Sequence, residues 1–95
     1  MDQASAREKA INHLTTVVAD CTDALGATDI WVDYSPMVRA KSLALFQETR
    51  DVASRLLASL QADEPVSRAD WKRVMPPGAK WADIFKVLRA DAEEP

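Results

Sequence analysis

Residues 35–61 read SPMVRAKSLALFQETRDVASRLLASLQ, and the rest of the chain is expected to pack around this segment. Ser35 is a suitable N-cap, and Pro36 suits the first helical position because its missing N–H would have no partner there. Apolar residues and one threonine then recur every three or four positions, which gathers them on one face of a helix. They are Leu45, Phe46, Thr49, Val52, Ala53, Leu56, Leu57 and Leu60. The pattern predicts one amphipathic helix over 36–61, roughly 39 Å long at about 1.5 Å per residue.

The opposite side of this helix is polar, and there Asp51 and Arg55 are spaced for an ion pair one turn apart. A helix of this length can serve as the spine of a small bundle, and it extends past the core that shorter neighbours can cover. The uncovered part would leave apolar surface exposed, and a second copy of the chain could bury that surface in a homodimer.

Length and composition restrict the class of protein. The chain has 95 residues, enough for a single domain with a modest core. It has only two glycines, which disfavours a turn-rich β fold, and its apolar runs are too short for a signal peptide or a membrane span. Its single cysteine cannot form an internal disulfide. We therefore expect one all-α domain over 1–95, located in the cytoplasm, with a short acidic tail at 91–95.

Other helices are expected to pack on the spine as a small antiparallel bundle of three to four helices, because the connections are short. The predicted helices span about 5–25, 36–61, 68–75 and 80–90. Ser5 and Glu8 form a capping-box pattern at the start of the first helix. Ser67 is the expected cap of the third, which has to end before Pro76 because a proline cannot continue a helix.

Residues 29–34 read DIWVDY, and their conformation is open from sequence alone. Ile30, Val32 and Tyr34 alternate with other residues as in a strand, but a lone strand has no pairing partner unless a second subunit provides one. A short helical turn or an ordered loop is therefore favoured. Trp31 and Tyr34 either plug the end of the bundle, the more common case, or form an exposed aromatic anchor for a partner.

Charge is distributed unevenly along the chain, whose net charge is −3. Residues 1–66 carry six Lys or Arg and ten Asp or Glu, whereas residues 67–92 carry six against three. No Lys or Arg occurs between Ala10 and Val38, although four aspartates do. The overall acidity argues against strong non-specific binding of nucleic acid, but a local basic face could still bind it.

The usual catalytic and metal-binding patterns are missing from the sequence. His13 and Cys21 lie eight residues apart on one predicted helix, roughly 12 Å along its axis, and cannot form a catalytic dyad. We expect Cys21 in the core and His13 solvated on the polar side. Asp29 and Asp33 more commonly form an exposed acidic patch than an acid–base pair. Ligand spacings for zinc or calcium are lacking. We expect no enzyme activity, no metal and no cofactor.

One alternative function is nucleic-acid binding by residues 67–90, which outline a helix-turn-helix. The cations there are Lys72, Arg73, Lys80, Lys86 and Arg89. With Gly78 at the turn, Ile84 and Val87 fall on positions that the motif buries, but Arg73 also falls on a buried position. The match is therefore little better than any amphipathic helix would give.

Protein binding is the function that we favour. Three tryptophans and one tyrosine are more than a bundle this small obviously needs, and exposed aromatics beside charges are typical of interface hot spots. The expected contact residues are Trp31, Asp33, Tyr34, Trp71, Lys72, Arg73, Lys80 and Trp81. We expect a regulator or inhibitor that docks on a larger partner protein, as some small helical proteins of phages and mobile elements do. This association rests on size and simplicity alone.

Overall fold

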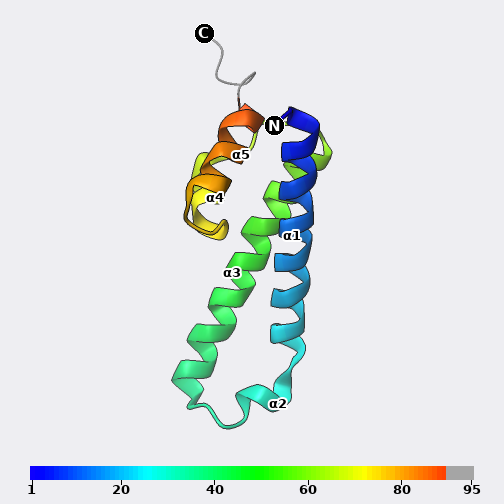
Figure 1. The fold of residues 1–95 in the computed structure, drawn as a ribbon. Helices are drawn as coiled ribbons and strands as arrows, with labels where there is room; N and C mark the ends of the chain where they lie inside the picture. The colour runs from blue at the N-terminus through cyan, green and yellow to red at the C-terminus, as the bar shows by residue number, and fades with distance from the viewer. Residues whose placement is uncertain (90–95) are drawn as a thin grey trace.

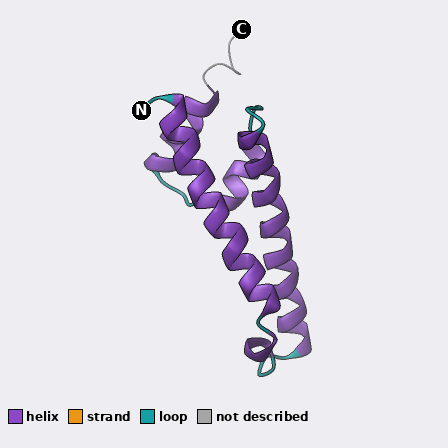
Figure 2. Cartoon of the chain, turned by 90° about the vertical axis from the view of Figure 1, so that its right-hand side faces the viewer, coloured by secondary structure: helices purple, strands orange, loops and turns teal. Residues whose placement is uncertain are grey.

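The structure, a computed structural model, describes residues 1–89 and shows an all-α fold. Its helices are α1 (Gln3–Gly26), α2 (Thr28–Trp31), α3 (Pro36–Gln61), α4 (Arg68–Val74) and α5 (Ala79–Arg89). Residues 1–89 contain no strand, so the predicted fold class is confirmed (Figure 2). The open segment 29–34 forms the short helix α2 and a turn. The predicted acidic tail at 91–95 and the end of the predicted helix at 90 lie outside the described residues.

The long helices α1 and α3 form an antiparallel hairpin, and α2 closes it at one end (Figure 1). At the other end α5 packs against α1 and α4 packs against α3. Helices α4 and α5 are much shorter than the hairpin, so they cover only the half of it that lies away from α2, the proximal half (Figure 1). The distal half, residues 19–26 and 36–47 with α2 between them, lies beyond the buried cluster and its packed neighbours and remains a two-helix structure.

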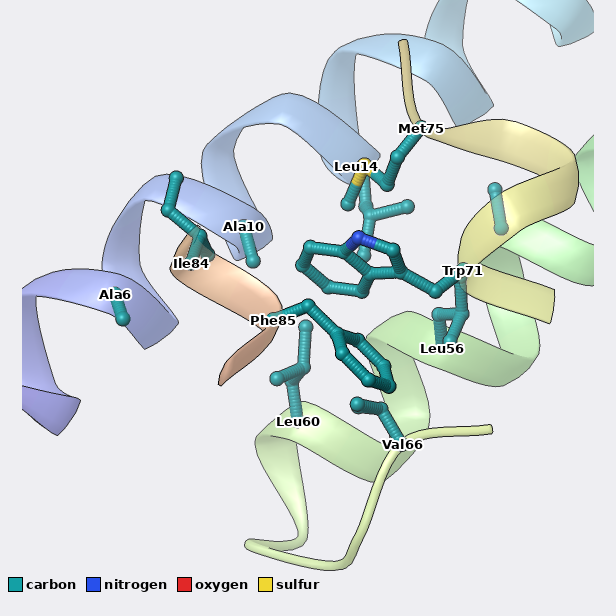
Figure 3. Packing of buried hydrophobic residues seen from close by; sticks show 11 residues of the cluster. Ala6, Ala10, Leu14, Leu56, Leu60, Val66, Trp71, Met75, Ile84 and Phe85 are labelled. Atoms are coloured by element: carbon teal, nitrogen blue, oxygen red, sulfur yellow. The ribbon is translucent and has the colours of Figure 1, made fainter. Parts of the chain in front are cut away.

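The core lies in the proximal half, where α1, α3, α4 and α5 meet. Trp71 of α4 lies in the middle of it, between the side chains of α1, α3 and α5 (Figure 3). The buried cluster consists of Ala6, Ala10, Leu14, Ala53, Leu56, Leu60, Val66, Trp71, Met75, Ile84 and Phe85. In the described distal half, by contrast, Cys21 is the one residue that is fully buried. The hairpin is therefore packed as a core at one end only.

Two of the predicted caps are confirmed. The Ser35 hydroxyl accepts a hydrogen bond from the backbone N–H of Val38 at 3.3 Å, and the Ser67 hydroxyl accepts one from that of Asp70 at 3.3 Å. The predicted capping box at Ser5 is wrong. The cap of α1 is Asp2, whose carboxylate accepts from the Ser5 N–H at 2.8 Å and so starts the helix two residues earlier. This hydrogen bond lowers the pKa of Asp2.

The predicted ion pair between Asp51 and Arg55 is not formed. Arg55 instead forms two hydrogen bonds to the carboxylate of Asp70, at 3.2 and 3.3 Å, and this contact raises the pKa of Arg55. Asp51 accepts a hydrogen bond from the Gln47 amide. Arg55 prefers this partner because the docking of α4 on α3 offers it a carboxylate that accepts two hydrogen bonds.

No helix within residues 1–89 combines the length and apolar character needed to cross a membrane.

Candidate functional site

Two surfaces stand out on the described part of the chain, and the first is an apolar seam along α3. Val38, Leu45 and Val52 are spaced by seven residues, so they follow nearly one line along the helix. Val52 is 2% exposed. It lies beside the ion pair between Arg73 of α4 and Glu48 of α3. Further along the same line, Leu45 is 62% exposed and Val38 is 46% exposed. The seam is therefore covered where α4 lies on it and bare beyond.

The bare seam continues onto the tip of the hairpin. Apart from Met1, every exposed large apolar side chain in residues 1–89 belongs to the distal half: Ile30, Val32, Tyr34, Met37, Val38 and Leu45. Such a concentration on one end of a small domain is typical of an interaction surface. The sequence signalled it only through the length of the 36–61 helix, because Leu45 shares its apolar face with buried residues such as Val52 and the sequence does not show which part of that face is covered.

At the tip, Trp31 and Tyr34 have different environments. Trp31 is half-buried: its ring Nε1–H donates to the carbonyl of Ala24 at 2.8 Å, and its ring lies 5.8 Å from that of Phe46. It plugs the end of the hairpin between α1 and α3. Tyr34 lies 5.5 Å from Trp31, ring to ring, but is 47% exposed, and Asp33 is exposed as well. Of these three predicted contact residues, Tyr34 and Asp33 are available at the surface.

The second surface is a groove of about 470 Å³ between α4 and α5. Its lining includes Trp71, Met75, Trp81 and Phe85, and the rigid turn from Pro76 to Gly78 lies at one end. Arg68, Lys72 and Lys86 also line it, and among the described residues no carboxylate does. Trp71 is only 5% exposed, so this predicted contact residue is chiefly a core residue, whereas Trp81 is half-buried. Sequence reasoning missed Arg68 and Phe85 because their position depends on how α4 and α5 pack.

The remaining predicted cations do not gather into one basic face. The Arg73 guanidinium is paired with Glu48 of α3, and the Lys80 ammonium lies 5.1 Å from the centre of the Trp81 ring. Arg89 donates to the carbonyl of Val66 at 2.6 Å. The Arg73 contact ties α4 to α3, and the Arg89 contact ties α5 to the segment before α4. Lys72 and Lys86 are the predicted cations that line the groove.

His13 is half-buried rather than fully solvated, contrary to the sequence-based expectation. Its ring lies 4.6 Å from that of Trp81, because α5 packs across this side of α1. Burial lowers the pKa of His13, and the nearby Lys80 ammonium lowers it further. Cys21 is buried as expected, and burial raises the pKa of its thiol. Both shifts favour the neutral side chains.

No group of three or more His, Cys, Asp or Glu side chains within residues 1–89 is arranged to hold a metal ion. Comparison with protein-family models, curated proteins and solved structures finds no match to the chain. The two surfaces described above are therefore the features from which function has to be argued.

Proposed function

We propose that this chain is a non-enzymatic, cytoplasmic protein-binding regulator or inhibitor, and that it docks on a larger partner protein through the distal half of its hairpin. The single observation that carries the proposal is the seam of α3, which changes from 2% exposed at Val52 to 62% exposed at Leu45. A folded domain gains nothing from extending two helices beyond its core and leaving their apolar side chains in water. A partner that covers them supplies the missing stabilisation.

The shape of the surface favours a helix as the occupant. In the proximal half the hairpin is covered by two short helices, α4 and α5, which lie on α3 and α1. An amphipathic helix of the partner laid along the distal half would continue that layer, with apolar side chains against Val38 and Leu45. This is helix-in-groove recognition, in which anchors spaced by three, four and seven residues enter the groove.

The energetic contribution of one seam residue can be estimated. Full burial of a leucine side chain is worth about 1.5–3 kcal/mol, and Leu45 is 62% exposed before binding. Covering it therefore contributes roughly 1–2 kcal/mol, which corresponds to about a 5- to 30-fold change in affinity. A glutamate at this position loses that contribution and also places a charge in an apolar contact, which is more costly still.

A second copy of the chain is a special case of this proposal, since two distal halves could cover each other in a homodimer. Sedimentation equilibrium of the full chain separates the two cases. A mass that doubles with concentration for the wild type but not for Leu45→Glu assigns the seam to self-association. A monomer at all concentrations leaves the seam to a different protein.

The test of partner binding is capture from the source cell's lysate with the tagged full chain, after nuclease treatment, with quantitative mass spectrometry. The wild type is compared with Leu45→Glu and with the matched control Ala40→Glu. Both residues are exposed on α3, but Ala40 lies about 140° around the helix from Leu45. We expect a protein that the wild type and Ala40→Glu capture equally and that Leu45→Glu captures at least tenfold less. Equal capture by all three would contradict the proposal.

A further inference from the structure

The groove between α4 and α5 differs in chemistry from the rest of the molecule. Although the chain carries a net charge of −3, the part of the groove lining that residues 1–89 form includes three cations and no carboxylate. Two of them, Lys72 and Lys86, are exposed, one on each of the helices that form the walls. The third, Arg68, lies with its guanidinium 5.2 Å from the centre of the Phe85 ring. A low-dielectric hollow with one sign of charge concentrates the opposite charge from solution.

Between these cations the groove is aromatic and apolar. Trp71 and Trp81 meet edge to face, with ring centres 6.4 Å apart, and Trp71 also lies 5.3 Å from Phe85. These rings, together with Met75, line a space of about 470 Å³. A volume of this size is within the range of roughly 300–1,000 Å³ that small-molecule sites occupy, and it can accept one or two large side chains. The walls are held in place by the core, because Trp71 belongs to it.

We propose that this groove binds an acidic peptide segment of a partner protein, with an aromatic or large aliphatic side chain seated in the groove against Trp81. Carboxylates next to that anchor pair with Lys72 and Lys86. The site is separate from the α3 seam, so the inference does not depend on the function proposed above. A chain with both surfaces connects two protein segments, one at each end of its hairpin.

The observations favour a peptide over a nucleic acid in this groove. A duplex or an extended single strand is bound by cations along a stripe, whereas Arg73 and Arg89 are engaged with Glu48 and with the Val66 carbonyl. The overall negative charge opposes a polyphosphate more than a short acidic segment, because the polyphosphate carries more charge. A short acidic segment needs only the few cations at the groove itself.

The experiment is selection of a phage-displayed library of random 12-residue peptides on the immobilised full chain. Enriched peptides are then synthesised with a fluorescent label, and their affinities are measured by anisotropy. The groove variant is Lys72→Glu/Lys86→Glu, and the control is Lys9→Glu/Lys41→Glu, which changes the net charge equally at exposed sites outside the groove lining. A further variant, Ala82→Gln, fills the groove without changing its charge, because Ala82 is an exposed residue of its lining.

We expect enriched peptides with at least two Asp or Glu beside an aromatic or large aliphatic residue. Their affinity should fall at least tenfold in the groove variant and in Ala82→Gln, and should change less than twofold in the control. Enrichment without an acidic excess, unchanged affinity in the groove variant, or no enrichment would overturn the proposal. So would tighter binding of a labelled 20-nucleotide oligothymidine than of any selected peptide, lost in the same variant, which would assign the groove to nucleic acid. Each variant is first checked for wild-type helicity by circular dichroism.

Discussion

Replacing Trp71 by alanine should destabilise the whole domain rather than only remove a binding contact. Trp71 is 5% exposed, and the centre of its ring lies 6.4 Å from that of Trp81 and 5.3 Å from that of Phe85. It also belongs to the buried cluster that joins α1, α3, α4 and α5. A cavity in its place would therefore be lined by side chains from several helices. Truncation of a buried aromatic residue to alanine typically costs about 3–5 kcal/mol.

That loss is large compared with the stability of a domain of this size. At roughly 0.05–0.15 kcal/mol per residue, a chain of 95 residues has about 5–14 kcal/mol to lose. Each kcal/mol shifts the melting temperature by about 4–8 °C in domains of 60–100 residues, so Trp71→Ala should melt at least about 10 °C below the wild type. The free energy of unfolding is measured by urea titration followed by far-UV circular dichroism.

Trp81→Ala is the matched comparison, because Trp81 is half-buried and packs against the same cluster. This substitution should lower the free energy of unfolding by less than Trp71→Ala does. A loss below about 1 kcal/mol for Trp71→Ala would refute the assignment of Trp71 to the core. The same result would return this tryptophan to the contact surface where the sequence placed it.

Three further predictions concern stability and reactivity. Because burial and Lys80 lower the pKa of His13 below its ordinary value of 6.5, the unfolded chain takes up this proton first as the pH falls. The free energy of unfolding should therefore decrease as the pH is lowered through about 6.5, and His13→Gln should flatten this dependence in urea titrations at about pH 7.5 and 5.5; an unchanged slope would show that His13 is not responsible. Cys21, whose buried thiol has a raised pKa, should react with iodoacetamide much more slowly than free cysteine until denaturant is added, and fast reaction in the native state would contradict its burial. Ser35→Ala removes the cap of α3 and should cost roughly 0.5–2 kcal/mol in the same titrations, whereas no loss would mean that water replaces the hydroxyl without penalty.

The sequence predicts helix boundaries well wherever the signal is local. The bounds of α3 agree with the prediction because Ser35 and Pro36 define its start within a few residues of chain. The start of α1 was predicted too late because Asp2 and Ser5 are both good caps, and the sequence does not show which of them the backbone uses. Local chemistry therefore identifies the candidates for a boundary but does not always choose among them.

Features that depend on which helix packs where could not be predicted from the sequence. The partner of Arg55 and the environment of His13 both come from the docking of α4 and α5. For the candidate surfaces, too, the sequence predicts one part and the packing of the helices determines the rest. The length of the 36–61 helix predicts that part of it is uncovered, but only the position of α4 shows that Leu45 is bare and Val52 is covered.

The proposed function depends on the apolar seam of α3 that the folded chain itself leaves uncovered. The most direct test is the free energy of unfolding of Leu45→Ala, measured for the isolated chain at low micromolar concentration. Because Leu45 is 62% exposed and only the remaining buried fraction is lost, we predict a value within about 1 kcal/mol of the wild type. A loss of about 2 kcal/mol or more, as for a buried leucine, would show that the folded chain already covers the seam and that no partner is needed to bury Leu45.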